Sequence, residues 1–310
     1  MQKKSMRIEY GKHLVEAGKA DKNIVVLDAD LKDSTQSIQF EKEYPDRFFD
    51  FGIAEQNMVG AAAGFAISGK IPIVHSFATF ISLRACEQVR TTIAYPNLNV
   101  KFVVSHAGVS CGSAGTTHHS IEDIAILRSI PNMKVFVPCD SSEMKQAFNE
   151  ALKINGPVYL RMTAGDVDEV CRSTDIFRIG KATLFREGSD ATIITTGILT
   201  QEGLKAAEMM KKRRGIDVRV LQMTSLKPID VDAIKSAAEE TQYIVTVEEH
   251  NVIGGLGSAV SEIVAELGIA KVKRIGIEDS FCGIGSARFL MDEEGLTSTN
   301  IVEKIVNLIK

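Results

Sequence analysis

Short apolar runs alternate with longer segments in which apolar residues recur every three or four positions, from one end of the chain to the other. Apolar runs of four to six residues predict buried parallel strands, and the longer periodic segments predict amphipathic helices. We predict strands at residues 23–27, 71–75, 100–105, 134–137, 158–161, 191–196, 218–222, 243–248 and 272–277. We predict helices at residues 6–20, 54–68, 82–94, 141–154, 201–214, 231–240, 256–267 and 299–308. Regular alternation of this kind indicates an α/β protein in which helices cover both faces of parallel sheets.

The alternating pattern is interrupted once, at residues 162–189, where the helical period is lost and Gly, Asp and Ser become frequent. We therefore expect two doubly wound α/β domains, at residues 1–165 and 191–310, joined by a linker at residues 166–190. The basic cluster at residues 211–214 stands directly before Gly215, which is typical of the C-terminal end of an exposed helix.

Composition indicates a globular protein and excludes several classes of partner. The chain has 310 residues, 45% hydrophobic and 25% charged, with a net charge of −4. This charge offers no footprint for nucleic acid or an anionic membrane, and no apolar run has the length of a membrane span. Five cysteines are scattered without metal-ligand spacing, so we expect no metal site in this chain and a reducing compartment, the cytoplasm.

Glu55 lies where the apolar run FFDFGI turns into a helix of small residues. A carboxyl group buried at that position has its charged form disfavoured, so we expect its pKa to rise and the group to share a proton with a ligand nitrogen. The alternative is an ordinary first-turn glutamate that the helix dipole stabilises. Residues 60–64 (GAAAG) leave one helix face almost bare, which allows another backbone to approach closely.

A segment of small residues between His106 and the pair His118 and His119 follows a predicted strand, where ligands bind in open α/β sheets. It holds three of the six histidines of the chain. Histidines suit proton transfer and phosphate binding, although a surface loop with incidental histidines fits the pattern too. A metal site fits less well, because adjacent histidines point in different directions. Ser120 is placed to cap the following helix.

Aromatic and basic residues follow another predicted strand. Phe77 and Phe80 are spaced to stack on a flat ring, with Arg84 and Arg90 on the same helix, although aromatic residues on a helix more often belong to the core. The Gly-rich residues 254–257 fit a tight strand-to-helix turn better than a phosphate loop. The chain has no GxGxxG after a strand, no Walker loop and no GDG followed by Asn at cofactor spacing.

Together, these segments resemble the pyrimidine-binding domain of transketolase: GIAEQNMVGAAAGFA, the pair Thr79-Phe80, SHAGVSCGSAGTTHHSIEDIAILRSIPNMKVFVPCD and PVYLR. Residues 191–310 resemble the C-terminal domain of the same enzymes. The GIAEQNM element is shared by the wider thiamine diphosphate superfamily. The THHSIED…LRSIPN stretch is closer to transketolase and 1-deoxyxylulose-5-phosphate synthase than to 2-oxoacid dehydrogenase β subunits.

The resemblance implies roles for individual residues. Glu55 would hydrogen-bond the aminopyrimidine ring of thiamine diphosphate, Phe80 and Phe77 would form the aromatic wall against that ring, and His118 would act at the reacting carbonyl. The implied ligands of the sugar phosphate are His106, Arg161, Arg7 and Ser34. One position departs from the family, since Ala114 stands where full-length transketolases commonly carry an aspartate that reads a substrate hydroxyl.

The resemblance also implies an activity and a partner. We expect the C-terminal subunit of a split transketolase of the pentose phosphate pathway, transferring a two-carbon ketol unit from a ketose phosphate to an aldose phosphate. A separate N-terminal subunit with the GDG…N motif would hold Mg²⁺ or Ca²⁺, and two copies of each chain would form an α2β2 heterotetramer. The alternatives are a 2-oxoacid dehydrogenase β subunit, a split 1-deoxyxylulose-5-phosphate synthase, and a catalytically silent protein that keeps the fold.

Overall fold

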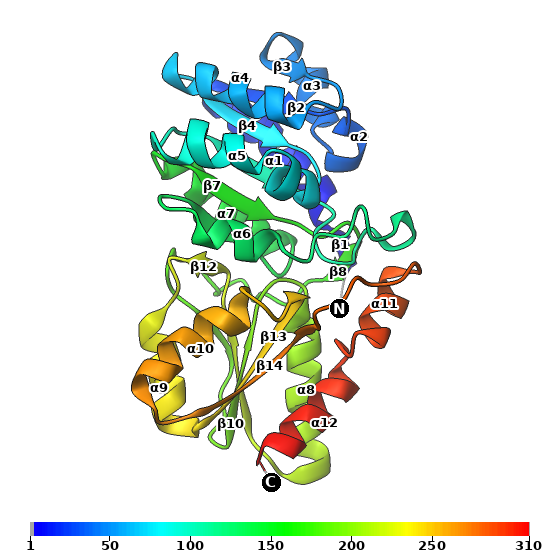
Figure 1. Cartoon of the computed structure of the whole chain (residues 1–310), viewed down its shortest axis with the longest axis vertical. Helices are drawn as coiled ribbons and strands as arrows, with labels where there is room; N and C mark the ends of the chain where they lie inside the picture. The colour runs from blue at the N-terminus through cyan, green and yellow to red at the C-terminus, as the bar shows by residue number, and fades with distance from the viewer. Residues whose placement is uncertain (1–2, 310) are drawn as a thin grey trace.

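The computed structural model describes residues 3–309 and has two α/β units, one above the other (Figure 1). The first unit is built on a seven-stranded sheet with the order β12-β6-β7-β5-β4-β2-β3. Its strands are β2 (Ile24–Asp28), β3 (Phe48–Asp50), β4 (Ile71–His75), β5 (Lys101–Val104), β6 (Lys134–Phe136), β7 (Val158–Arg161) and β12 (Ser225–Lys227). Neighbouring strands are parallel except β12, which pairs antiparallel with β6.

The second unit is built on a five-stranded sheet with the order β14-β13-β10-β11-β9. Its strands are β9 (Thr183–Arg186), β10 (Ala191–Thr195), β11 (Val218–Gln222), β13 (Tyr243–Asn251) and β14 (Lys271–Ile277). Only the edge strand β9 is antiparallel to its neighbour. A separate two-stranded ribbon, β1 (Lys3–Ser5) with β8 (Asp166–Asp168), lies at the junction of the units (Figure 1).

Helices cover both faces of the sheets, and the longer ones bury an apolar side against the strands. The first unit has α1 (Met6–Ala20), α2 (Lys32–Thr35), α3 (Ile38–Glu43), α4 (Glu55–Ile67), α5 (Cys86–Gln88), α6 (Asp123–Ser129) and α7 (Ser141–Lys153). The second has α8 (Leu199–Arg214), α9 (Val231–Thr241), α10 (Leu256–Leu267), α11 (Ala287–Glu293) and α12 (Ser298–Ile309). One apolar cluster joins residues of both units, including Val104, Leu127 and Ile244.

The predicted α/β class is confirmed, and each predicted strand and helix corresponds to an observed one. The helix predicted at residues 82–94 differs in detail, since α5 is flanked by two π-helical turns, Phe80–Arg84 and Val89–Ala94. The expected cap at Ser120 is wrong: α6 begins at Asp123, and the buried Ser120 hydroxyl has no hydrogen-bond partner within the described part of the chain. Gly215 ends α8 in the left-handed conformation, as its position after the basic cluster predicted.

The segment expected to be a linker contains two short strands. β8 pairs with β1, and β9 forms the edge of the second sheet. β12, which comes from the second half of the chain, forms the edge of the first sheet. None of the described helices is both long and apolar enough to cross a membrane.

Candidate active site

A pocket of about 300 Å³ opens at the carboxyl ends of the parallel strands β2 and β4 in the first unit. This is the edge of an open α/β sheet where ligands bind. Its wall combines carboxylates, aromatic rings and one histidine, contributed by four separate chain segments. The lining residues are Ala29, Asp30, Leu31, Ile53, Glu55, Phe77, Phe80, Arg84, Thr117 and His118.

Glu55 is the first residue of α4, and its side chain is only 1% exposed. Both of its oxygens accept from Nη1 of Arg84, at 2.9 and 2.8 Å, and the Ser76 hydroxyl lies 3.4 Å from Oε1. The side chain is buried, as the sequence predicts, and the structure adds a guanidinium that pairs with both of its oxygens.

The aromatic wall is formed by Phe77 and Phe80, which stack with ring centroids 5.8 Å apart and planes inclined by 15°. The Arg84 guanidinium lies 4.2 Å from the Phe80 centroid while it donates to Glu55. A flat group with N–H donors, stacked on an aromatic ring and facing a buried carboxylate, is therefore the shape and chemistry that this wall accommodates. An aminopyrimidine ring is such a group, because it is flat and carries N–H donors.

Two of the predicted histidines adjoin this wall. His106 stacks on Phe77 at 3.9 Å, and His118 meets Phe80 edge-on at 5.4 Å. Burial, reinforced by the nearby charges of Arg7 and His118, lowers the pKa of His106 to about 4, so this ring is neutral at pH 7. Each Nδ1 lies within hydrogen-bond distance of a neighbouring hydroxyl, Ser105 for His106 and Thr117 for His118, which leaves each Nε2 for a ligand.

His119 points away from the pocket, since it is buried and its Nε2 pairs with the carbonyl of Gly112. The adjacent histidines thus face different surroundings.

Arg7 and Ser34, which the sequence placed far apart, lie together next to His106. Arg7 Nη1 donates to the carbonyl of Ser34 at 2.5 Å, and its Nε donates to that of Ala164 at 2.9 Å. Burial lowers the pKa of Arg7, while its charge acts on His106. Arg7 carries the positive charge among these three residues, and that charge acts on the His106 ring that stacks on Phe77.

Arg161, which is expected to bind the sugar phosphate, lies in a buried ion pair. It is 5% exposed, and its Nε donates to Asp123 Oδ2 at 2.7 Å while its Nη2 donates to Oδ1 at 3.2 Å. Although burial alone raises the pKa of Asp123, the charge of Arg161 and the Tyr159 hydroxyl at 2.7 Å bring it below its ordinary value. This internal ion pair does not favour the expected role of Arg161 as a phosphate ligand.

Sequence reasoning missed two carboxylates at the end of β2. Asp30 lines the pocket with a φ of 61°, a conformation in which a residue other than glycine is uncommon. Asp28 accepts from the Leu31 amide and from the Thr35 and Ser37 hydroxyls, and burial raises its pKa to about 6. The run DAD directly after a buried strand was the available signal.

Among residues 3–309, one cluster has the spacing of metal ligands, Cys139, Asp140 and Cys171. Its carboxylate already accepts from three backbone amides, those of Glu143, Val170 and Cys171. The two sulfurs lie 3.6 Å apart, and burial raises the pKa of the Cys139 thiol well above its ordinary value. The cluster shares no residue with the pocket and ties the segment after β8 to the start of α7.

The fold and the pocket define a class: α/β proteins whose sheet-end site presents a buried helix-start glutamate and an aromatic wall to a flat nitrogen ring. Residues 2–168 match the model of the transketolase pyrimidine-binding domain, and residues 180–301 match that of the transketolase C-terminal domain. The chain belongs to the transketolase family and corresponds to its C-terminal section. Membership implies dependence on thiamine diphosphate.

Similar proteins cover nearly the whole chain. A protein described as a transketolase C-terminal section from Methanocaldococcus jannaschii is 45% identical over 99% of this chain and 97% of its own length. The 6-deoxy-6-sulfo-D-fructose transketolase subunit of Clostridium sp. (strain MSTE9) is 42% identical over 96% and 92%. A solved split-gene transketolase, described as an inactive β4 tetramer, has a TM-score of 0.90 and 43% identity, with 98% of each chain covered.

Proposed function

We propose that this chain is the catalytic C-terminal subunit of a split transketolase, which transfers a two-carbon ketol unit from a ketose phosphate to an aldose phosphate. The observation that carries the proposal is Glu55, buried at the start of α4 and facing the aromatic wall. Split relatives that align over their full length support a two-chain enzyme.

Glu55 would hold the pyrimidine ring of thiamine diphosphate by a hydrogen bond, with Phe80 and Phe77 against its face. When bound, the cofactor supplies the nucleophile that attacks a ketose carbonyl. Glu55 would share a proton with a ring nitrogen, because its carboxyl group is buried and lies in the pocket wall. His118, with Nε2 without a partner in the described chain, would take or give the proton of a substrate hydroxyl.

Arg7, together with Ser34 and the neutral His106 ring, would bind the anionic end of the sugar. An arginine is suited to phosphate because its planar donors match phosphate oxygens. A related subunit is named for a sulfonated sugar, so the anion is not fixed by the family. Ala114 is exposed and offers no side-chain polar group to a substrate hydroxyl. The complex would act in the pentose phosphate pathway.

The partner would be the N-terminal transketolase subunit, which would hold the diphosphate and Mg²⁺ or Ca²⁺ through its GDG…N motif. A methyl group added at Gly60 or Gly64 would meet no atom within 4 Å, so this face of α4 is open to a close-packed contact. We propose an α2β2 heterotetramer, related by the twofold symmetry usual in oligomers. All five cysteines are free, which fits the cytoplasm.

The test is an assay of the purified chain with thiamine diphosphate and Mg²⁺, with and without the GDG-bearing subunit. We expect ketol transfer between sugar phosphates only when both chains are present. Pyruvate or another 2-oxoacid as the preferred donor would instead favour a synthase or a dehydrogenase subunit. Full activity of this chain alone would overturn the split-enzyme proposal.

A further inference from the structure

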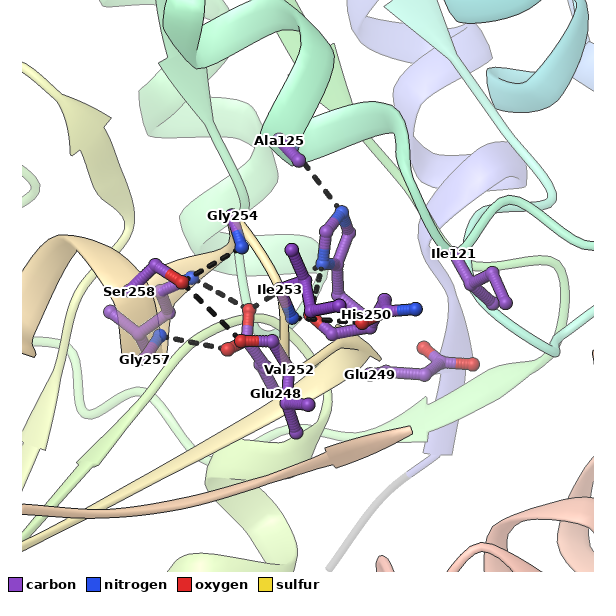
Figure 2. A network of polar contacts seen from close by, with 12 residues as sticks. Ile121, Ala125, Glu248, Glu249, His250, Val252, Ile253, Gly254, Gly257 and Ser258 are labelled. Carbon is purple, nitrogen blue, oxygen red and sulfur yellow. Dashed lines mark hydrogen bonds and ion pairs between the residues drawn. The ribbon is translucent and has the colours of Figure 1, made fainter. Parts of the chain in front are cut away.

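The end of β13 joins the second unit to the first through four consecutive residues, 248–251 (Figure 2). Glu248 points toward its own unit, where its carboxylate accepts from the amides of Leu256 and Gly257 at 2.6 and 2.8 Å. These contacts anchor the Gly-rich turn before α10. Because Glu248 already binds both amides, the turn is a strand-to-helix connection and does not offer them to a phosphate.

The next side chain, Glu249, points in the opposite direction, toward the first unit, as alternation along a strand requires (Figure 2). It is 4% exposed, and its Oε1 accepts from the amide of Val109 at 2.9 Å. Its carboxyl group also packs directly on Gly108, where an added Cβ would lie 2.3 Å from Glu249 Cδ. The contact therefore depends on both the glutamate and the missing side chain at position 108.

Further contacts fix the same strand end against the first unit. The Asn251 amide donates to the carbonyl of Ile121 at 2.8 Å, and the Ala125 amide donates to His250 Nε2 at 3.3 Å. Arg161 Nη2 donates to the carbonyl of Glu249 at 3.0 Å. The backbone of Glu249 is thus fixed by these contacts to the first unit, while its carboxylate binds the Val109 amide.

Val109 begins the loop that carries His118. The loop is closed at its base by a pair of hydrogen bonds between Gly108 and Ser120, each 2.9 Å long. His106 lies just before this base, and His118 lies just inside its other end. Because both histidines lie close in the chain to this base, a displacement of the base at Val109 moves both rings, and both contact the aromatic wall.

We propose that Glu249 is a positioning residue for the site: it extends from the C-terminal unit and holds the loop that sets the places of His106 and His118. This gives the C-terminal unit a function in the site although none of its residues lines the pocket. The consequence for activity rests on the proposed ketol transfer, whereas the consequence for the two histidines does not.

The experiment compares Glu249→Met, which keeps the volume but removes the acceptor, with Glu249→Gln, which keeps an oxygen that can accept. Glu248→Met is the matched control, because Glu248 is equally buried on the same strand and does not contact the loop. Histidine-labelled full-length chain is measured by NMR, which follows the six imidazoles of the chain, with His13 and His75 as internal references. Two further measurements are hydrogen exchange of the Val109 amide and ketol transfer by the two-chain complex.

We expect Glu249→Met to shift the His106 and His118 signals and to speed exchange of the Val109 amide roughly tenfold or more, the factor expected from a lost buried hydrogen bond. Glu249→Gln should restore both toward wild type, and Glu248→Met should move only His250. Unchanged His106 and His118 signals and Val109 exchange in Glu249→Met would overturn the proposal. If Glu249→Met shifts the His106 and His118 signals but the wild-type complex shows no ketol transfer, the positioning role is supported and the proposed activity is refuted.

Discussion

Replacing Arg84 by alanine tests whether its guanidinium occupies the place of the cofactor ring. Arg84 pairs with both oxygens of Glu55 and lies over Phe80, so the substitution empties the wall and leaves a buried carboxylate without its cation. We expect two effects of opposite sign. The free energy of unfolding should fall, and the affinity of the two-chain complex for thiamine diphosphate should rise.

The magnitude follows from the exposure of the two partners. Breaking a fully buried ion pair costs about 3–5 kcal/mol. Glu55 is buried, but the Arg84 side chain is 43% exposed, so water screens the pair, and we expect a loss of stability of roughly 1–3 kcal/mol. If the ring has to displace Arg84 from the same contacts, about 1.4 kcal/mol of that energy corresponds to a tenfold gain in cofactor affinity.

Urea unfolding measures the stability of the chain, and a calorimetric titration of the complex with thiamine diphosphate measures the affinity. Arg90→Ala is the matched control, because Arg90 is an exposed arginine on the same segment that does not line the pocket. The double variant Glu55→Gln with Arg84→Ala should recover stability, since no buried charge remains. A weaker affinity in Arg84→Ala would refute the reasoning and make Arg84 a ligand of the cofactor or substrate.

Three further predictions follow from individual side chains. Glu55→Gln should lower ketol transfer by the complex roughly 100-fold or more without unfolding the chain, because an amide cannot share the ring proton; near-normal turnover would remove Glu55 from catalysis. Arg161→Ala should lower stability by about 3–5 kcal/mol, because it leaves Asp123 buried and unpaired, and should affect KM for phosphorylated and unphosphorylated sugars alike. A selective loss for phosphorylated sugars in a stable protein would restore the phosphate role. Burial raises the pKa of Glu249 from its ordinary 4.5 to about 7, so its stabilising contribution is complete below pH 4.5 and is lost as pH rises toward 7. Wild-type Tm should therefore fall relative to Glu249→Gln across that range, and parallel curves would contradict this assignment.

The fold could be predicted largely from local pattern, because the hydrophobic pattern of a long buried strand or a periodic helix identifies it without information from distant residues. Most of the missed elements are short. The missed strands β1, β3, β8, β9 and β12 have three or four residues each, and each is a strand only because another segment offers it a partner edge. A window of three or four residues does not carry that information.

The site divides in the same way. Glu55, the two phenylalanines, His106 and His118 could be predicted because each lies in a distinctive local motif, and the structure brings them together around one pocket. The roles of the arginines could not be derived, because a role depends on which carboxylate lies within reach. Asp123 is 38 residues from Arg161, and Glu55 is 29 from Arg84.

These two ion pairs use the same chemistry in different surroundings. Asp123 and Arg161 are both buried, so neither can exchange its partner for water, and the pair is a fixed part of the frame that also holds Glu249. Arg84 keeps much of its side chain in solvent, so it can leave Glu55 and remain hydrated. In the proposed function, Glu55 would then pass from one flat N–H donor to another without standing unpaired in the protein interior. The difference in exposure between the two arginines predicts that Arg84, and not Arg161, is the replaceable partner.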